Sequence, residues 1–455
     1  MNPAVKFKSI LASAVAMLFV FTATAVHADV KLPAIFGSHM VLQQNQPINV
    51  WGWAEPGESV TVTFGKSSTN AKADDDGNWK VKLPAVTADG KAHELSVVGK
   101  NKIKLTDVLI GEVWVGSGQS NMQWPLSQTH GAAEAIKAAN LPNVRLIYVP
   151  RVQKPAPEKD FDAAWTTCTP ETVPNFSAVL YYFGKKLNEE LDIPIGLIHS
   201  SWGGSPIEPW IVKGKSSGNM YNGMIAPLQP FSIKGSIWYQ GETNVIRKNG
   251  LTYTGKMADL INGWRKAWNS DLSFHFVQIA PWSGKYAPGQ LPALWEAQAA
   301  TLKLPKTGMA VVTDLVDNIA DIHPRNKLDV GNRLALWALA KDYGKTDVVY
   351  SGPFYKSLKV EGNKAKISFA HLGGGLKSRD EKPLTEFEIA GADNKFVKAQ
   401  AMIEGDVVVV TAEGVKTPTQ VRFGWHKLAN PNLINSAGLP AAPFQTKNWT
   451  GVTGE

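Results

Sequence analysis

The sequence predicts an α/β protein in which a parallel-sheet core lies between two β regions. In residues 106–345, short apolar segments alternate with amphipathic segments, which is typical of a parallel sheet covered on both faces by helices. In the flanking residues, apolar and polar side chains alternate with a period of two, which is typical of half-buried strands. A chain of 455 residues is long enough for roughly two to four domains with cores of their own.

Residues 1–28 have the pattern of a secretory signal peptide. Lys6 and Lys8 precede an apolar run over residues 10–25, and Val26-His27-Ala28 follows it as a cleavage site. The run is shorter than the ~20 residues that a membrane span needs. We therefore expect cleavage after Ala28, export to a bacterial periplasm or exterior, and no membrane insertion afterwards.

Residues 29–105 are expected to form a β-sandwich-like domain. The segments 59–64 and 79–83 alternate apolar and polar side chains, so each predicts a strand with one buried face. Asp76-Gly77, which lies between these segments, is a typical hairpin turn.

Residues 106–345 are expected to form the α/β core. Val330, Leu334 and Trp337 recur at helical spacing and predict one buried helix face. Short apolar segments predict strands over residues 113–115, 193–199, 233–239, 272–279 and 309–313. Amphipathic segments predict helices over residues 178–191, 253–268, 294–302 and 326–343.

Residues 346–455 are expected to form a C-terminal β region. Short apolar segments broken by Gly, Asp and Asn predict strands over residues 365–369, 385–389, 406–410 and 420–425. No low-complexity linker separates this region from the core, so we expect the three regions to pack closely.

Composition and charge exclude several classes of protein. With 44% hydrophobic and 19% charged residues and a mean hydropathy of -0.14, the chain is neither disordered nor a polytopic membrane protein. The net charge of +8 is mild for this length and no dense Lys/Arg run occurs, so we expect no nucleic-acid partner. Cys168 is the only cysteine, which excludes an internal disulfide, and no base lies near it in sequence, so we expect a structural role.

The residues that follow the predicted strands carry the candidate chemistry, because ligands of parallel sheets bind at the carboxyl ends of the strands. Ser120 lies in Gly116-Ser-Gly-Gln-Ser-Asn-Met122, where small residues allow a sharp turn that presents a nucleophile. The segment is not Gly-x-Ser-x-Gly, so an α/β-hydrolase elbow fits badly. Gly203 and Gly204 follow the next strand and could expose backbone N–H groups to an oxyanion or simply form a turn.

Two further strand ends add an amide and an acid–base pair. Gln240 offers an uncharged N–H donor beside a glycine. His323 precedes Pro324, a residue that suits the first position of a helix, and Asp321 lies in the same loop. Asp314, Asp317, Asp321 and His323 could instead hold a metal, but they lack the ligand spacing of known metal motifs, so we predict no metal site.

These strand-end segments resemble the sialate O-acetylesterase family, a branch of the SGNH (GDSL-like) hydrolases close to carbohydrate esterase family six. The resemblance implies a flavodoxin-like parallel sheet, a hydrolase catalytic domain over residues 106–345, and no cofactor. It rests on Gly118-Gln-Ser-Asn-Met122, Leu197-Ile-His-Ser-Ser-Trp-Gly-Gly204, Trp238-Tyr-Gln-Gly-Glu242 and Asp321-Ile-His-Pro-Arg-Asn-Lys327, with further matches at residues 36–43, 221–227 and 438–444.

The resemblance also implies the role of each site residue. Ser120 would be the nucleophile, His323 its base and Asp321 the acid that orients His323. The oxyanion would be held by the backbone N–H of Ser120, by an amide of Gly203 or Gly204, and by Gln240. Two departures stand out. Asn is usual in the superfamily where this chain has Gln240. The usual Asp-x-x-His spacing is shortened here, so the acid could instead be Asp317, Asp314 or a backbone carbonyl.

The expected function is removal of O-acetyl groups from a carbohydrate through a Ser-His-Asp acetyl-enzyme mechanism. Trp124, Trp202 and Trp238 are expected to contact the sugar, and Arg325 could pair with the carboxylate of a sialic acid. The alternatives are an acetylxylan or other plant-polysaccharide esterase, a lipase or thioesterase of the same superfamily, and a non-catalytic glycan-binding protein. The sequence fixes neither the sugar, nor the acetyl position, nor the oligomeric state.

Overall fold

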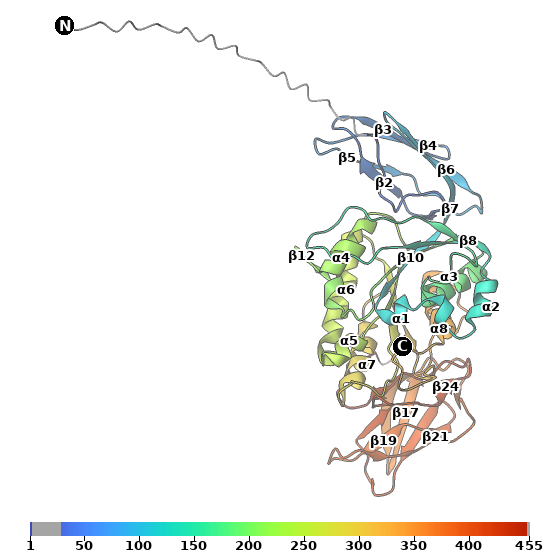
Figure 1. Cartoon of the computed structure of the whole chain (residues 1–455). Coiled ribbons are helices and arrows are strands. Elements are labelled where there is room, and N and C mark those ends of the chain that lie inside the picture. Colours follow the sequence, from blue (N-terminus) through green and yellow to red (C-terminus); the bar gives the residue numbers. More distant parts are fainter. Residues whose placement is uncertain (2–28, 453–455) are drawn as a thin grey trace.

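The computed structural model describes Met1 and residues 29–452. The expected signal peptide lies in residues 2–28, outside the described residues. Figure 1 shows the chain as three regions in sequence order. The N-terminal strands lie at one end, the helices and parallel strands in the middle, and the C-terminal strands at the other end. None of the helices in the described part combines the length and the hydropathy that crossing a membrane requires.

The middle region contains a sheet with the strand order β15-β14-β13-β7-β10-β8-β9. All neighbours are parallel except β8 and β9, which are antiparallel. This confirms the α/β fold predicted from the alternating pattern. The strands are β7 (Lys102–Gly118), β8 (Leu141–Tyr148), β9 (Thr166–Cys168), β10 (Ile195–Ser201), β13 (Gly235–Tyr239), β14 (Ser273–Gln278) and β15 (Thr307–Val311).

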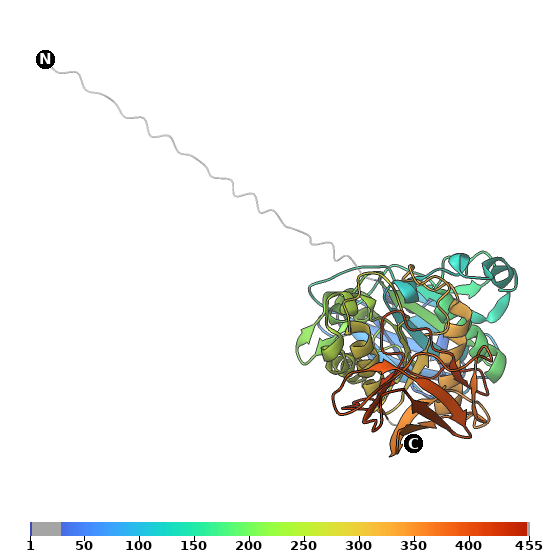
Figure 2. The same ribbon diagram turned by 90° about the horizontal axis from the view of Figure 1, so that it is seen from below.

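Helices cover both faces of this sheet. Helices α3 (Ala178–Leu191) and α8 (Lys327–Asp342) pack against each other on one side, and α6 (Tyr253–Trp268) and α7 (Gln290–Thr301) pack together on the other. Figure 2 shows the yellow-green helices and the green and orange helices on opposite sides of the strands. The shorter helices are α1 (Ser120–Gln123), α2 (Ala132–Lys137), α4 (Asn219–Met224) and α5 (Glu242–Ile246).

The predicted helices over residues 178–191 and 253–268 match α3 and α6, and local capping explains their ends. The Ser177 side chain accepts a hydrogen bond from Leu180 N at 3.2 Å and begins α3. Helix α6 ends at Asn269, whose left-handed φ of 48° suits a terminating residue. Asn326 caps α8 by accepting from Asp329 N at 3.1 Å.

The N-terminal β region is joined to the central sheet by one long strand. Strand β7 is 17 residues long and crosses residue 105, where the sequence pattern placed a boundary. It pairs with β6 at its start and with β10 and β13 further on. The region also contains β1 (Val41–Gln43), β2 (Ile48–Trp53), β3 (Ser59–Phe64), β4 (Ser67–Lys72), β5 (Asn78–Leu83) and β6 (His93–Val98).

The C-terminal β region confirms the additional strands that the sequence predicts. It contains two four-stranded sheets, β16-β17-β22-β21 and β20-β19-β23-β25. Ile367, Val408 and Phe423 belong to a hydrophobic cluster separate from that of the rest of the chain. The strands are β16 (Phe354–Glu361), β17 (Lys364–Ala370), β19 (Phe387–Ala390), β20 (Val397–Lys398), β21 (Gln400–Glu404), β22 (Val407–Thr411), β23 (Gln420–Phe423) and β25 (Phe444–Gln445), with β18 (Leu376–Ser378) and β24 (Leu433–Asn435) as a separate pair.

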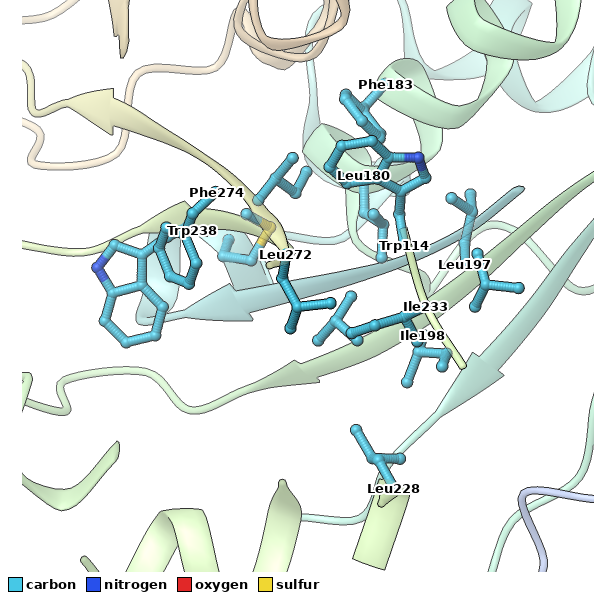
Figure 3. Packing of buried hydrophobic residues seen from close by; sticks show 14 of the residues in the cluster. Trp114, Leu180, Phe183, Leu197, Ile198, Leu228, Ile233, Trp238, Leu272 and Phe274 are labelled. Carbon is cyan, nitrogen blue, oxygen red and sulfur yellow. The ribbon is translucent and has the colours of Figure 1, made fainter. Parts of the chain in front are cut away.

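Large apolar side chains fill the space between the sheet and its helices. Trp114 of β7 is fully buried and meets Phe183 of α3 edge-on, with ring centroids 5.0 Å apart. Figure 3 shows Trp114 beside Phe183, and Trp238 beside Phe274 in a separate part of the core, where Trp238 also packs on Trp264 of α6. This packing holds the carboxyl ends of β7, β10 and β13 side by side, and the candidate site lies there.

Candidate active site

Ser120 and His323 meet at the carboxyl edge of the sheet. Ser120 begins α1 directly after β7, and His323 lies in the loop between β15 and α8. The Ser120 Oγ and His323 Nε2 atoms are 2.9 Å apart. Gly118 permits the turn before Ser120, because its φ is +134° and a Cβ there would lie 2.2 Å from the carbonyl oxygen of Tyr239.

Asp321 is the candidate acid that contacts His323. One of its carboxylate oxygens lies 3.4 Å from His323 Nδ1 and accepts the His323 backbone N–H at 2.9 Å. The other two candidates face elsewhere: Asp314 pairs with Arg333 at 2.6 Å, and Asp317 lies 3.2 Å from the ring of His130. The structure therefore brings Ser120, His323 and Asp321 together and leaves Asp314 and Asp317 outside this group.

The surroundings of His323 favour its neutral form. Burial lowers the pKa of the imidazole, the charge of Lys327 lowers it further, and Asp321 opposes both. The Trp124 ring stacks on the imidazole, with centroids 4.8 Å apart and planes 25° apart. A neutral, half-buried imidazole next to a serine hydroxyl can accept the proton of that hydroxyl.

Of the two candidate glycines, Gly203 lies against Ser120. A Cβ on Gly203 would be 3.5 Å from the Ser120 Cβ, whereas one on Gly204 would meet nothing within 4 Å. The Gly203 N–H donates to Oε1 of Gln123 at 2.6 Å. Gln123 was not singled out by the sequence patterns, because nothing local distinguishes it from a surface glutamine.

Gln240 is completely buried and its side chain is fully hydrogen-bonded. Its amide nitrogen donates to the side chains of Gln119 at 3.0 Å and Asn244 at 2.8 Å. Its amide oxygen accepts the Tyr253 hydroxyl at 2.6 Å. In this arrangement Gln240 fixes the residue before Ser120 and does not present a hydrogen to the space above it.

A buried polar cluster beneath the site was also missed by the sequence analysis. Asn121 donates to Glu242 at 2.6 Å and to the Ile322 carbonyl at 3.1 Å, and it accepts from the ammonium of Lys327. Burial raises the pKa of Glu242 and lowers that of Lys327 to about 7. Only their positions in the sequence could have pointed to these residues, because Asn121 follows Ser120 and Lys327 lies four residues after His323. The cluster ties the serine turn to the histidine loop.

A hydrogen-bonded chain links the histidine loop to the C-terminal β region. The Lys427 ammonium donates to the carbonyls of Ser283, Gly284 and Tyr286 at 3.2, 2.8 and 3.0 Å. Trp282 donates through its indole N–H to the Ala320 carbonyl at 3.0 Å, one residue before Asp321. Lys427 thus positions the loop that supports the candidate acid.

The remaining predicted substrate contacts are placed differently. Trp202 is partly buried and packs against the hydrophobic cluster, and Arg325 is exposed. Trp238 is fully buried among Trp210, Trp264 and Phe274, so the structure corrects the expectation that it contacts a sugar. The reason is that β13 lies inside a sheet covered on both faces. Cys168 is buried, and burial raises the pKa of its thiol to about 12.

A cavity of about 710 Å³ adjoins the candidate site at Gln123. Pro125, Tyr148 and Phe176 give it apolar surface, and Asp162 and Asn175 give it polar groups. None of the described residues that line it is a lysine or an arginine. In the described part of the chain, no group of three or more His, Cys, Asp or Glu side chains is arranged to hold a metal ion.

The comparisons with known proteins agree on one class. A family model described as carbohydrate esterase, sialic acid-specific acetylesterase, matches residues 110–339. The sialate O-acetylesterases of Pongo abelii and Homo sapiens are each 30% identical to this chain, with 91% of this chain and 92% of the relative covered. A carbohydrate acetylesterase from Xanthomonas citri, known from a crystal structure, is 40% identical, with a TM-score of 0.88 over 92% of this chain and 100% of that chain.

Proposed function

The chain belongs to the sialic acid-specific acetylesterase family of carbohydrate esterases and is a carbohydrate O-acetylesterase, and we propose that Ser120, His323 and Asp321 carry out its reaction. The observation that carries this proposal is the 2.9 Å contact between Ser120 Oγ and His323 Nε2 at the carboxyl edge of the sheet. No other serine–histidine contact in the described residues lies at that edge with both side chains open to solvent.

In the proposed mechanism, Ser120 Oγ attacks the acetyl carbonyl carbon while His323 Nε2 takes the serine proton. The C–O bond to the sugar then breaks, and His323 returns that proton to the departing sugar oxygen. Water attacks the acetyl-enzyme next, with His323 again accepting a proton, and acetate leaves as Ser120 regains its hydrogen. Asp321 orients His323 and stabilises the imidazolium that forms twice in the cycle.

The negative charge on the acetyl oxygen requires N–H donors aimed at it. The Ser120 N–H stands at the start of α1, and Gly203 lies beside Ser120. We assign the oxyanion to these two groups. Gln240 would have to give up a hydrogen bond to Gln119 or Asn244 in order to join them, so we assign it to fixing the serine turn.

We place the sugar in the cavity beside Gln123. Apolar faces such as those of Tyr148 and Phe176 suit the C–H face of a sugar ring, and Asp162 and Asn175 can bond its hydroxyls. The same lining favours a second candidate, a neutral acetylated sugar such as that of a plant polysaccharide. A sialic acid carboxylate would need a cation there, and Arg325 is exposed in a different loop.

Acetate release tests this function. The mature protein would be assayed with 4-nitrophenyl acetate, O-acetylated sialic acid and acetylated xylan, beside Ser120→Ala and the exposed control Ser127→Ala. We expect Ser120→Ala to lose acetate release on every donor and Ser127→Ala to keep it. A Ser120→Ala protein as active as wild type would refute the mechanism. A wild-type protein that binds glycans yet releases no acetate would favour the glycan-binding alternative.

We also propose export, on the signal-peptide pattern of residues 1–28. Expression of the full chain in a bacterium, followed by N-terminal sequencing of the product, is expected to show Asp29 as the first residue of a periplasmic or secreted protein. A product that starts at Met1 and stays in the cytoplasm would refute it.

A further inference from the structure

The side chain of Gln123 accepts the hydrogen of the Gly203 N–H, which is one of the two groups that we assign to the oxyanion. Its Oε1 accepts the Gly203 N–H at 2.6 Å, which is a short and well-formed hydrogen bond. Gly203 is also the glycine whose backbone lies against Ser120, with a Cβ position 3.5 Å from the Ser120 Cβ. A backbone amide has one hydrogen, so Gly203 cannot serve Gln123 and an oxyanion at full strength together.

The position of Gln123 in α1 explains why this competition is built in. Gln123 lies three residues after Ser120, so one helical turn places both side chains on neighbouring parts of the same surface. The Gln123 backbone N–H bonds to the Gln119 carbonyl at 2.9 Å, which fixes its main chain. The side chain is only partly buried, so it can rotate while the turn that carries Ser120 stays in place.

Gln123 is at the same time part of the wall of the 710 Å³ cavity. A ligand in that cavity therefore lies next to Gln123, the residue whose side-chain oxygen holds the Gly203 N–H. Sugar hydroxyls are good donors to an amide oxygen and good acceptors from an amide nitrogen, so a sugar ring offers Gln123 replacement partners. An acetyl ester without a sugar offers none.

We propose that Gln123 is the specificity-determining residue of this esterase: a sugar ring bound in the adjoining cavity draws its amide away from Gly203, which frees that N–H for the oxyanion. This inference rests on the proposed function, because it takes Ser120 as the nucleophile. It predicts that the enzyme stabilises the oxyanion better for acetyl groups carried on a sugar than for acetyl groups on small alcohols.

Two variants test the proposal. Gln123→Ala removes the side chain, and Gln123→Met keeps its length without an amide oxygen. Because one oxyanion donor is worth about 10²–10³ in kcat, freeing a partly blocked one should raise kcat/KM for 4-nitrophenyl acetate by about threefold to tenfold. With the preferred acetylated glycan, kcat/KM should fall and KM should rise, since the sugar loses a partner. Gln128→Ala, an exposed glutamine in the next turn, is the matched control and should change neither value.

A purely structural role for Gln123 predicts a different result. Both variants would then lose activity on the small ester and on the glycan in the same proportion, and the melting temperature would fall. That outcome, or an unchanged activity on 4-nitrophenyl acetate, would overturn the proposal. Failure of the proposed function is distinguishable, because it shows as acetate release that persists in Ser120→Ala.

A measurement on the wild-type protein keeps the proposal testable if both variants fold poorly. Diethyl 4-nitrophenyl phosphate forms a tetrahedral adduct on a nucleophilic serine and uses the same N–H donors. The deacetylated form of the preferred glycan, added at saturation, should accelerate this inactivation by about threefold or more through release of Gly203. Inactivation that is slowed or unchanged by the glycan would contradict the proposal.

Discussion

The described residues contain two sets of one serine, one histidine and one aspartate in contact, and the two sets do different things. In the first, His323 stands between Ser120 and Asp321 at the carboxyl edge of the sheet, and its side chain is 24% exposed. In the second, Asp342 stands in the middle and accepts hydrogen bonds from both Ser273 and His275, at the amino end of β14. There the His275 side chain is 0% exposed.

The order of the contacts and the access to solvent decide the chemistry of each set, and residue types alone do not. A histidine that bonds a serine can take its proton, whereas a histidine and a serine that both bond one carboxylate leave neither free to react. Burial would raise the pKa of Asp342, but the hydrogen bonds from His275 and Ser273 outweigh it and lower the pKa. The second set therefore holds α8 to β14.

The largest expected effect separates the two histidines. His323→Asn should lower kcat/KM for acetyl esters by about 10⁴-fold, because the serine loses its base, and should leave the melting temperature close to that of wild type. His275→Asn should keep kcat/KM per folded molecule within about twofold and lower the melting temperature. Steady-state kinetics and thermal unfolding on the same samples check both. Loss of activity in a folded His275→Asn protein would break the comparison.

The next effect concerns the acid of the buried set. Asp342→Ala should lower the free energy of unfolding by about 3 kcal/mol, since it leaves His275 and Ser273 without their shared partner in the interior. Denaturant unfolding measures this, with the exposed Asp347→Ala as a matched control that should change stability by less than about 0.5 kcal/mol. Equal losses in the two variants would show that the buried set contributes nothing special.

The acid of the exposed set should matter for rate. Asp321→Asn should lower kcat/KM by about 10²-fold, because Asn cannot stabilise the imidazolium with a full charge. This is less than for a close aspartate, as the contact to His323 Nδ1 is 3.4 Å long. Asp317→Asn, in the same loop, should cost less than about threefold. A larger loss for Asp317 than for Asp321 would move the acid role to Asp317.

The smallest effect concerns the pH dependence of activity and of stability. The pKa of His323 is lowered below 6.5, so kcat/KM for 4-nitrophenyl acetate should rise with pH through a midpoint below 6.5 and then level off. Asp342 has a lowered pKa when folded, so its stabilisation is complete above 3.8 and is lost as the pH falls below that value. Activity should therefore be lost as His323 takes up a proton, and the stabilisation by the buried set should be lost as Asp342 takes up a proton. The measurements are a pH–rate profile and acid unfolding of wild type and Asp342→Ala, whose stabilities should converge at the acid end.

Much of the fold could be predicted from the sequence because local signals fix it. Ser177 caps the start of α3 and Asn269 caps the end of α6, and the ends of both helices match the predicted ranges. Strand β7 was predicted only over residues 113–115, since its early residues alternate in burial while residues 108–118 are all buried. No single periodicity covers both halves of such a strand, so its continuity across residue 105 could not be seen.

The candidate site likewise contains residues that the sequence could predict and residues that it could not. Ser120 and His323 follow strands and carry reactive groups, so position and chemistry together pointed to them. Gln123 and Asn121 act through contacts with Gly203 and Lys327, which lie about 80 and 200 residues away in the chain. Their side chains have nothing locally unusual, so only the folded structure gives them a role.

The contact of Lys427 with the three carbonyls has a consequence for protein engineering. An excised hydrolase module ending at residue 345 would contain each residue of the proposed triad but would lack the cation that holds residues 283–286. Those carbonyls would turn to water, and the support of Ala320 by Trp282 would loosen with them. Grafting this active site into another scaffold therefore means transplanting the C-terminal β region as well, because that region supports the histidine loop.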